Sequence, residues 1–216
     1  MEKLQIMPED RILILSPHPD DECIGLGGLL SMFAAQIDVW LLTDGRYGGR
    51  EPYDPALPGI RKNEFVTEME YLGIKSYKFF EVEDGTLKQN CNLLNDEPIS
   101  LYSIIFVPHK YEVHPDHKAC YKILKNALIN QDISNLTVFQ YEITTPMHDM
   151  THYLDITDKM GMKIDCIQMH ASQRELLDYS QASKALNTFR ACMRGKPHSF
   201  YEMVCYTPID KIVNDK

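Results

Sequence analysis

The stretch Arg11-Ile-Leu-Ile-Leu-Ser-Pro-His-Pro-Asp-Asp-Glu22 decides the fold, because it joins a short apolar run to a polar loop. The run from Arg11 to Leu15 is branched and ends at Ser16-Pro17, which is typical of a buried strand. The following segment, Ile24 to Ala35, is long and apolar and is predicted to form a helix that packs on a sheet. A strand, a loop and a helix in this order indicate an α/β protein with a mostly parallel sheet.

The same alternation continues along the chain. Further strands are expected at 38–42, 76–80, 103–107 and 136–141, and helices at 61–72 and 115–128. In the last third, helices are expected at 157–172 and 173–194, followed by an edge strand at 200–206. The segment 81–98 is polar and is predicted to be a surface excursion. Without a linker between these parts, we predict one Rossmann-like α/β domain over residues 1–216, with helices on both faces of the sheet.

Composition excludes several classes of protein. The 216 residues carry 22 Lys and Arg against 31 Asp and Glu, whereas a nucleic-acid partner calls for a basic excess. No stretch approaches the ~20 apolar residues that span a bilayer, and the first residues lack a signal-peptide pattern. We therefore expect a cytoplasmic protein with neither a nucleic-acid nor a membrane partner. Six cysteines without a CxxC pair indicate reduced thiols rather than a disulfide framework.

Two clusters of His and Asp follow two of the predicted strands. The first is Ser16-Pro-His-Pro-Asp-Asp-Glu22, and the second is His114-Pro-Asp-His117. Ligands of open α/β sheets bind beyond the carboxyl ends of the strands, which is where both clusters are expected to lie. Either cluster alone is typical of a turn or a helix N-cap, but the pair favours a metal site.

The residue types in these clusters suit zinc chemistry. Imidazole and carboxylate are normal zinc ligands, and three protein ligands leave a coordination position open. His18 and Asp21 are close enough in sequence to bind one ion, and one later imidazole would complete the set of three ligands. Asp20 then remains as a base for a metal-bound water, whose pKa zinc lowers to about 7. We expect one Zn²⁺ per chain, with Fe²⁺ or Co²⁺ as substitutes.

At these residues the sequence resembles the LmbE-like, or PIG-L, family of zinc-dependent N-deacetylases. The pair of motifs His18-Pro-Asp-Asp-Glu22 and His114-Pro-Asp-His117 carries the resemblance. Further similar landmarks are Thr43-Asp44-Gly45, Arg61-x-x-Glu64, Leu72-Gly73-Ile74, Asp155-Ile-Thr157, Lys163, His170-x-Ser172-Gln173 and Phe200-Tyr-Glu202. The resemblance implies a hydrolase that removes the N-acetyl group from an amino sugar such as N-acetylglucosamine, or from its conjugate.

Carried over residue by residue, the resemblance also implies roles. It makes His18, Asp21 and His117 the zinc ligands. It makes Asp20 the general base that activates the metal-bound water. His114 becomes the imidazole that stabilises the oxyanion or protonates the leaving amine.

The remaining site residues complete this expectation. Asp116 would hydrogen-bond His114 and fix its tautomer, and Arg61 resembles a family arginine that contacts the sugar. Arg46 is a further candidate for reaching the substrate. Some family members carry a tyrosine two residues before the first His of the second motif. Here that position is Glu112 and Tyr111 is its neighbour, so the role of the tyrosine stays open.

Two other functions stay open from the sequence. One is a metal-dependent amidase that acts on a non-carbohydrate acylated amine, and the other is a non-catalytic sugar-binding protein of the same fold. Dinucleotide binding is excluded, because Leu30 stands where the fingerprint that begins at Gly25 requires its last glycine. The expected partner is a small-molecule N-acetyl sugar. The resemblance also supports a homo-oligomer, since bacterial members of the family often self-associate.

Overall fold

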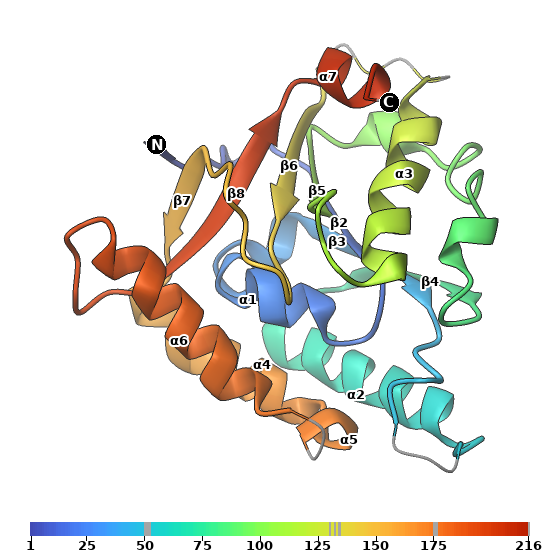
Figure 1. The fold of residues 1–216 in the computed structure, drawn as a ribbon, viewed down its shortest axis with the longest axis horizontal. Coiled ribbons are helices and arrows are strands. Elements are labelled where there is room, and N and C mark those ends of the chain that lie inside the picture. The colour runs from blue at the N-terminus through green and yellow to red at the C-terminus, as the bar shows by residue number, and fades with distance from the viewer. Residues whose placement is uncertain (50–52, 130, 132, 134, 175–176, 216) are drawn as a thin grey trace.

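The computed structural model describes residues 1–49, 53–129, 131, 133, 135–174 and 177–215. Its centre is a sheet of eight strands in the order β1-β7-β8-β6-β5-β2-β3-β4 (Figure 1). The strands are β1 (Glu2–Lys3), β2 (Ile12–Ser16), β3 (Ile37–Thr43), β4 (Ser76–Val82), β5 (Ile104–Pro108), β6 (Thr137–Tyr141), β7 (His152–Asp155) and β8 (Tyr201–Thr207). Strand β8 pairs antiparallel with β6 and β7, and the other pairings are parallel.

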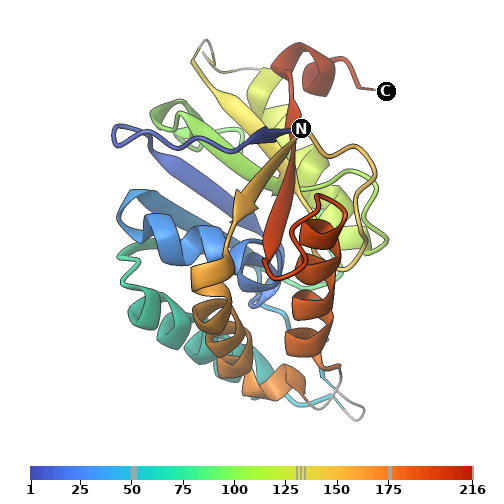
Figure 2. The same cartoon turned by 90° about the vertical axis from the view of Figure 1, so that its left-hand side faces the viewer.

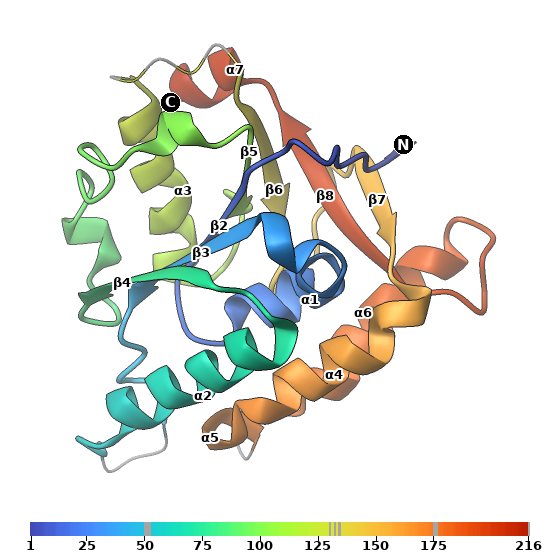
Figure 3. The same cartoon turned by 180° about the vertical axis from the view of Figure 1, so that it is seen from behind.

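Helices cover both faces of this sheet. They are α1 (Asp21–Phe33), α2 (Leu57–Leu72), α3 (Pro115–Ile129), α4 (Met160–Met169), α5 (Ala171–Arg174), α6 (Tyr179–Cys192) and α7 (Ile209–Val213). Helices α3 and α7 lie on one face, and α1, α2, α4 and α6 lie on the other (Figures 1 and 3). Figure 2 looks onto the β1–β7 edge of the sheet, where the N-terminus lies. No helix in the described ranges is long and apolar enough to cross a membrane.

The central strand β2 shows why the sequence builds two apolar layers. All five of its residues are buried, and successive side chains of a strand point to opposite faces. Ile12 and Ile14 pack in the cluster beneath α1, whereas Leu13 and Leu15 pack in the cluster beneath α3. Removing these apolar side chains from water on both faces fixes the strand at the centre of the fold.

The order of the strands reverses beside β2. The chain runs from β2 to β3 and β4 on one side, and then crosses to β5 and β6 on the other side. Strands β2 and β5 are parallel neighbours, with Ile12 opposite Ile104, so their carboxyl ends open at the same edge. This is the crevice in which ligands of open α/β sheets bind.

The predicted single α/β domain with a mostly parallel sheet and helices on both faces is confirmed. One local prediction was wrong, and another was incomplete. The strand at 200–206 is not at the edge, because β7 and β1 extend the sheet beyond β8. The excursion at 81–98 is not merely superficial, since Leu87 and Leu94 are fully buried in it and Asp84 is nearly so. Part of the predicted helix at 173–194, residues 175–176, lies outside the described residues.

Candidate metal and catalytic site

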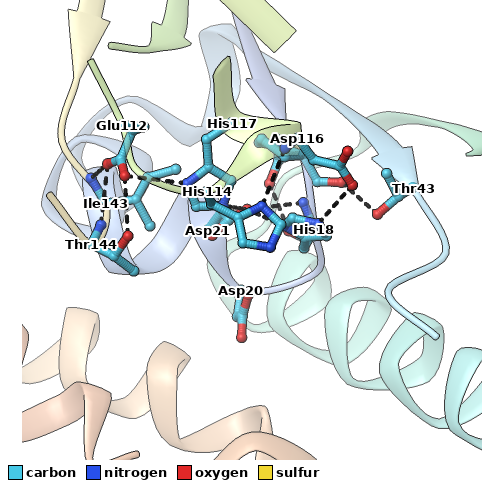
Figure 4. Close-up of polar contacts among 12 residues, drawn as sticks. His18, Asp20, Asp21, Thr43, Glu112, His114, Asp116, His117, Ile143 and Thr144 are labelled. Atoms are coloured by element: carbon cyan, nitrogen blue, oxygen red, sulfur yellow. Dashed lines mark hydrogen bonds and ion pairs between the residues drawn. The ribbon is translucent and has the colours of Figure 1, made fainter. Parts of the chain in front are cut away.

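The two His-Asp clusters meet where β2 and β5 end (Figure 4). His18 lies in the loop after β2, Asp21 begins α1, and His117 lies in the first turn of α3. The Oδ2 atom of Asp21 is 2.9 Å from His18 Nδ1 and 3.1 Å from His117 Nε2. One carboxylate oxygen therefore sits between two imidazole nitrogens, and these three side chains offer a donor set that suits zinc.

The other nitrogen of each imidazole faces a second, buried carboxylate. His18 Nε2 is 3.1 Å from Asp84 Oδ1 and 3.4 Å from Asp116 Oδ2. His117 Nδ1 is 3.5 Å from Glu112 Oε2. Imidazoles that bind a metal generally have such a partner on the far nitrogen, because it fixes the orientation and tautomer of the ring. The surroundings of His18 and His117 thus fit metal ligands.

Backbone N–H groups hold the outer carboxylates in place. Glu112 Oε1 accepts hydrogen bonds from the N–H groups of Ile143, Thr144 and Thr145 at 2.9, 3.2 and 3.3 Å. Burial raises the pKa of Glu112, but hydrogen bonds from His109, His117 and the Ile143 N–H outweigh burial and hold it well below its usual range. The carboxylate of Glu112 is therefore ionised and fixed behind His117.

The charges in the cluster favour a cation at its centre. Burial lowers the pKa of His117, but the charge of Asp21 and its hydrogen bonds to Asp21 and Glu112 raise that pKa to about 9. The pKa of His18 is likewise raised well above its ordinary value, since hydrogen bonds to Asp116, Asp21 and Asp84 outweigh burial. The pKa of Asp21 lies well below its usual range, because both histidines oppose the effect of burial. Carboxylates therefore attract positive charge to the point where the imidazoles converge.

His114 differs from the two buried histidines. It is exposed, and its ring meets that of His18 edge to face with 4.8 Å between centroids. Partial desolvation of its ring, together with the charges of His18 and His117, lowers its pKa, which keeps it neutral. Its Nδ1 accepts the backbone N–H of Asp116 at 3.3 Å, so the proton of the neutral ring is on Nε2.

The expected hydrogen bond between the Asp116 carboxylate and His114 is not formed. Instead, Asp116 Oδ2 accepts the Gly85 N–H at 2.7 Å and Oδ1 accepts the Leu87 N–H at 3.2 Å. These two N–H groups belong to the segment 81–98, whose packing turns the carboxylate toward His18. The contact expected from the resemblance is therefore wrong, because the N–H groups of this segment hold the Asp116 carboxylate toward His18 instead.

Asp20 is set apart from the other carboxylates of the site. Its backbone is left-handed, with φ at 118°, and Figure 4 shows its side chain directed away from the imidazoles. Burial raises the pKa of Asp20 to about 6, although the guanidinium of Arg61, 3.2 Å away, opposes that shift. Asp20 therefore has no imidazole partner in the described structure. Its carboxylate is free of the histidines and can accept a proton.

A cavity of about 190 Å³ brings these residues together. Its lining includes both clusters, with His18, Asp20, Asp21, His114 and His117, and also Tyr47, Arg61, Asp84 and Thr144. Arg46 does not line it: its guanidinium lies 2.5 Å from Asp44 Oδ2 and 3.5 Å from Glu83 Oε2. Tyr111 does not line it either and is 65% exposed, whereas its neighbour Glu112 is fully buried.

Sequence reasoning did not find two carboxylates that contact the candidate ligands His18 and His117. Asp84 lies two residues after the end of β4, in the dipeptide Asp84-Gly85, and this position after a strand was a signal that could have been used. For Asp84, hydrogen bonds and the charge of His18 outweigh burial and lower the pKa to about 2. Glu112 was noted as a departure from the family pattern, but its position behind His117 depends on the loop at 143–145, which the sequence did not place.

Other groups of side chains could also hold a metal. His18, His114 and His117 offer three nitrogens within 4.8 Å of one another, and His18, Asp84 and Asp116 form a buried set. A separate group of buried side chains comprises Glu22, Cys23, Glu68 and His170. In that group His170 Nε2 is 2.8 Å from Glu68 Oε2, and burial raises the pKa of Glu68 to about 7.

The chain is similar to proteins that are named as deacetylases. The profile of the PIG-L family, described as GlcNAc-PI de-N-acetylase, matches residues 13–128, which is more than half of the chain. A probable N-acetyl-alpha-D-glucosaminyl L-malate deacetylase 2 of Bacillus subtilis (strain 168) is 24% identical, over 77% of this chain and 85% of its own. The diacetylchitobiose deacetylase of Thermococcus kodakarensis is 28% identical, over 76% and 70%.

Solved structures share the fold. An N,N'-diacetylchitobiose deacetylase from Pyrococcus horikoshii superposes with a TM-score of 0.75 at 21% identity, covering 94% of this chain and 85% of that chain. A 4-carboxy-2-hydroxymuconate hydratase from Pseudomonas putida superposes with a TM-score of 0.71 at 18% identity, over 92% and 96%. Because a deacetylase and a hydratase both have this fold, function has to be argued from the site.

Proposed function

The chain belongs to the PIG-L family, and from this membership we propose that it is a metal-dependent hydrolase that removes the acetyl group from an N-acetylated amino sugar or its conjugate. The observation that carries the proposal is the convergence of the metal-type donors His18, Asp21 and His117 with Asp20 on one cavity. Relatives named as deacetylases of N-acetylglucosaminyl malate and of diacetylchitobiose support a sugar substrate.

His18, Asp21 and His117 would hold one divalent metal ion. Zinc suits two imidazoles and a carboxylate, and Fe²⁺ or Co²⁺ can substitute for it. When bound, the ion supplies Lewis-acid polarisation of the acetamide carbonyl and lowers the pKa of water. The outer carboxylates Asp84 and Glu112 keep the two imidazoles turned toward Asp21.

The protein's own groups then manage the protons. Asp20 takes a proton from the water that attacks the acetamide carbon. His114, whose proton is on Nε2, donates a hydrogen bond to the oxygen that becomes negative. The proton held by Asp20 passes to the amine nitrogen as the C–N bond breaks, and the products are acetate and a free amino sugar.

The sequence also leads to proposals on the domain extent, the substrate, the location and the assembly of this protein. We propose one deacetylase domain over residues 1–216, a small-molecule N-acetyl sugar as substrate, a cytoplasmic location and a homo-oligomer. Arg61 lines the cavity and so can take part in the substrate site, whereas Arg46 lies outside the cavity lining.

Metal content and acetate release together test the function. The wild type and His117→Ala are purified in parallel, analysed for metals, and incubated with N-acetylglucosamine, an N-acetylglucosamine glycoside and an acylated non-carbohydrate amine. We expect one zinc ion per wild-type chain, its loss in the variant, and acetate release from the sugars. Acetate from the non-carbohydrate amine alone would instead establish an amidase. Tight sugar binding without acetate release in zinc-replete protein would establish a binding protein.

A further inference from the structure

Arg61 lies where three segments of the site meet. It projects from α2 and is 3% exposed. Its Nη2 donates a hydrogen bond of 2.6 Å to the Pro19 carbonyl and lies 3.2 Å from Asp20 Oδ1. Its Nη1 donates a hydrogen bond of 2.9 Å to the Gly45 carbonyl. One guanidinium therefore ties α2 to the loop after β2 and to the loop after β3.

The residue that Arg61 contacts has an unusual backbone. Asp20 has a φ of 118°, and a residue other than glycine keeps such a conformation only where its surroundings hold it. The Asp20 carbonyl accepts the Ile24 N–H at 3.0 Å, which fixes the start of α1. On the other side, Arg61 Nη2 fixes both the carbonyl before Asp20 and the carboxylate of Asp20. The guanidinium thus determines where the Asp20 carboxylate points.

Two loop glycines make room for this guanidinium. A Cβ on Gly45 would lie 2.8 Å from Arg61 Nη1, and φ at Gly45 is +62°. A Cβ on Gly48 would overlap with Arg61 Nη1. A Cβ on Gly59, in the same helix as Arg61, would meet nothing within 4 Å. The close approach at 45 and 48 indicates that the loop after β3 is shaped around Arg61.

We propose that Arg61 is a positioning residue that holds Asp20 for turnover. This inference rests on the proposed deacetylase function and assigns Arg61 a different part in it. Both terminal nitrogens of the guanidinium contact protein oxygens, and Nε is buried without a partner in the described structure. These contacts use three of the five N–H groups, and all three acceptors belong to the two loops that carry Asp20 and Gly45.

The test separates an effect on turnover from an effect on binding. Arg61→Ala and Arg61→Lys are compared with Gly48→Ala, which keeps the arginine but displaces it, and with Gly59→Ala as the matched control. For each variant kcat and KM for acetate release are measured, together with metal content and thermal unfolding. We expect kcat to fall about 10- to 100-fold in Arg61→Ala and Gly48→Ala with KM and metal content unchanged.

The two other variants sharpen this expectation. Arg61→Lys should recover part of kcat, because an ammonium group can contact Asp20 but cannot also reach the Pro19 and Gly45 carbonyls in the same geometry. Gly59→Ala should match the wild type. A raised KM with unchanged kcat in Arg61→Ala would overturn the inference and make Arg61 a sugar-binding residue. Absence of acetate release by the wild type overturns the proposed function, and this inference with it.

Discussion

Replacement of Asp20 by Asn tests the role of the proposed base. Asn has the shape of Asp, and its Oδ1 can still accept a hydrogen bond from Arg61, which lies 3.2 Å from Asp20 Oδ1. An amide oxygen, however, cannot take a proton from water at neutral pH. The substitution therefore leaves the buried geometry in place and removes the proposed chemical step.

The size of the effect follows from what surrounds Asp20. Three carboxylates line the described cavity, and the other two, Asp21 and Asp84, are committed to imidazoles at 2.9 and 3.1 Å. No neighbouring carboxylate in the described structure is therefore free to replace Asp20. General-base catalysis contributes about 10²- to 10⁴-fold, so kcat should fall at least ~100-fold. That loss corresponds to about 2.7 kcal/mol or more in the activation free energy.

The assay compares Asp20→Asn with Asp21→Asn, a matched change at the next residue. Acetate release at saturating substrate gives kcat, and elemental analysis after dialysis gives metal content. Asp20→Asn should keep its metal, because Asp20 contacts no imidazole in the described structure, whereas Asp21→Asn should lose it, because Asp21 Oδ2 contacts both His18 and His117. A kcat for Asp20→Asn within a few-fold of the wild type would refute the base assignment. Loss of metal in both variants would make Asp20 a ligand.

Three further results are expected. Glu112→Gln should weaken metal affinity about 10- to 100-fold, because the charged partner of His117 Nδ1 is lost; competition with a chelator measures this, and unchanged affinity would contradict the role of Glu112. His114→Ala should keep the metal but lower kcat about 100-fold or more, and an equal loss of metal would show that His114 is a ligand. Burial raises the pKa of Glu68 from 4.5 to about 7 in the folded protein. The Glu68 carboxyl therefore loses its proton at a lower pH in the unfolded chain than in the folded chain, and the stability of the fold decreases as pH rises from 4.5 to 7. Glu68→Gln lacks that loss, so between pH 5 and 7 its stability in urea unfolding should gain on the wild type by about 2 kcal/mol, and parallel pH profiles would rule the explanation out.

The sequence by itself determined the central unit of the fold. Residues 11–35 carry a buried-strand run, a polar loop and an apolar helix, and local burial of that pattern dictates β2 and α1. It also put His18, Asp21, His114 and His117 at strand ends, because the motifs directly follow β2 and the loop after β5. These features depend on neighbours in the chain, which is why reading the chain in order could find them.

Tertiary structure alone decided which side chains meet. His18 contacts Asp84 from 66 residues away and Asp116 from 98 residues away. Asp116 faces His18 rather than His114 because N–H groups of the 81–98 segment hold it, and Arg61 faces Asp20 because three segments enclose it. Periodicity tells which face of an element is buried, but the partner of a buried charge is set by strand order and packing between distant segments. The residues proposed as ligands could therefore be selected from the sequence, whereas the groups that contact them could not.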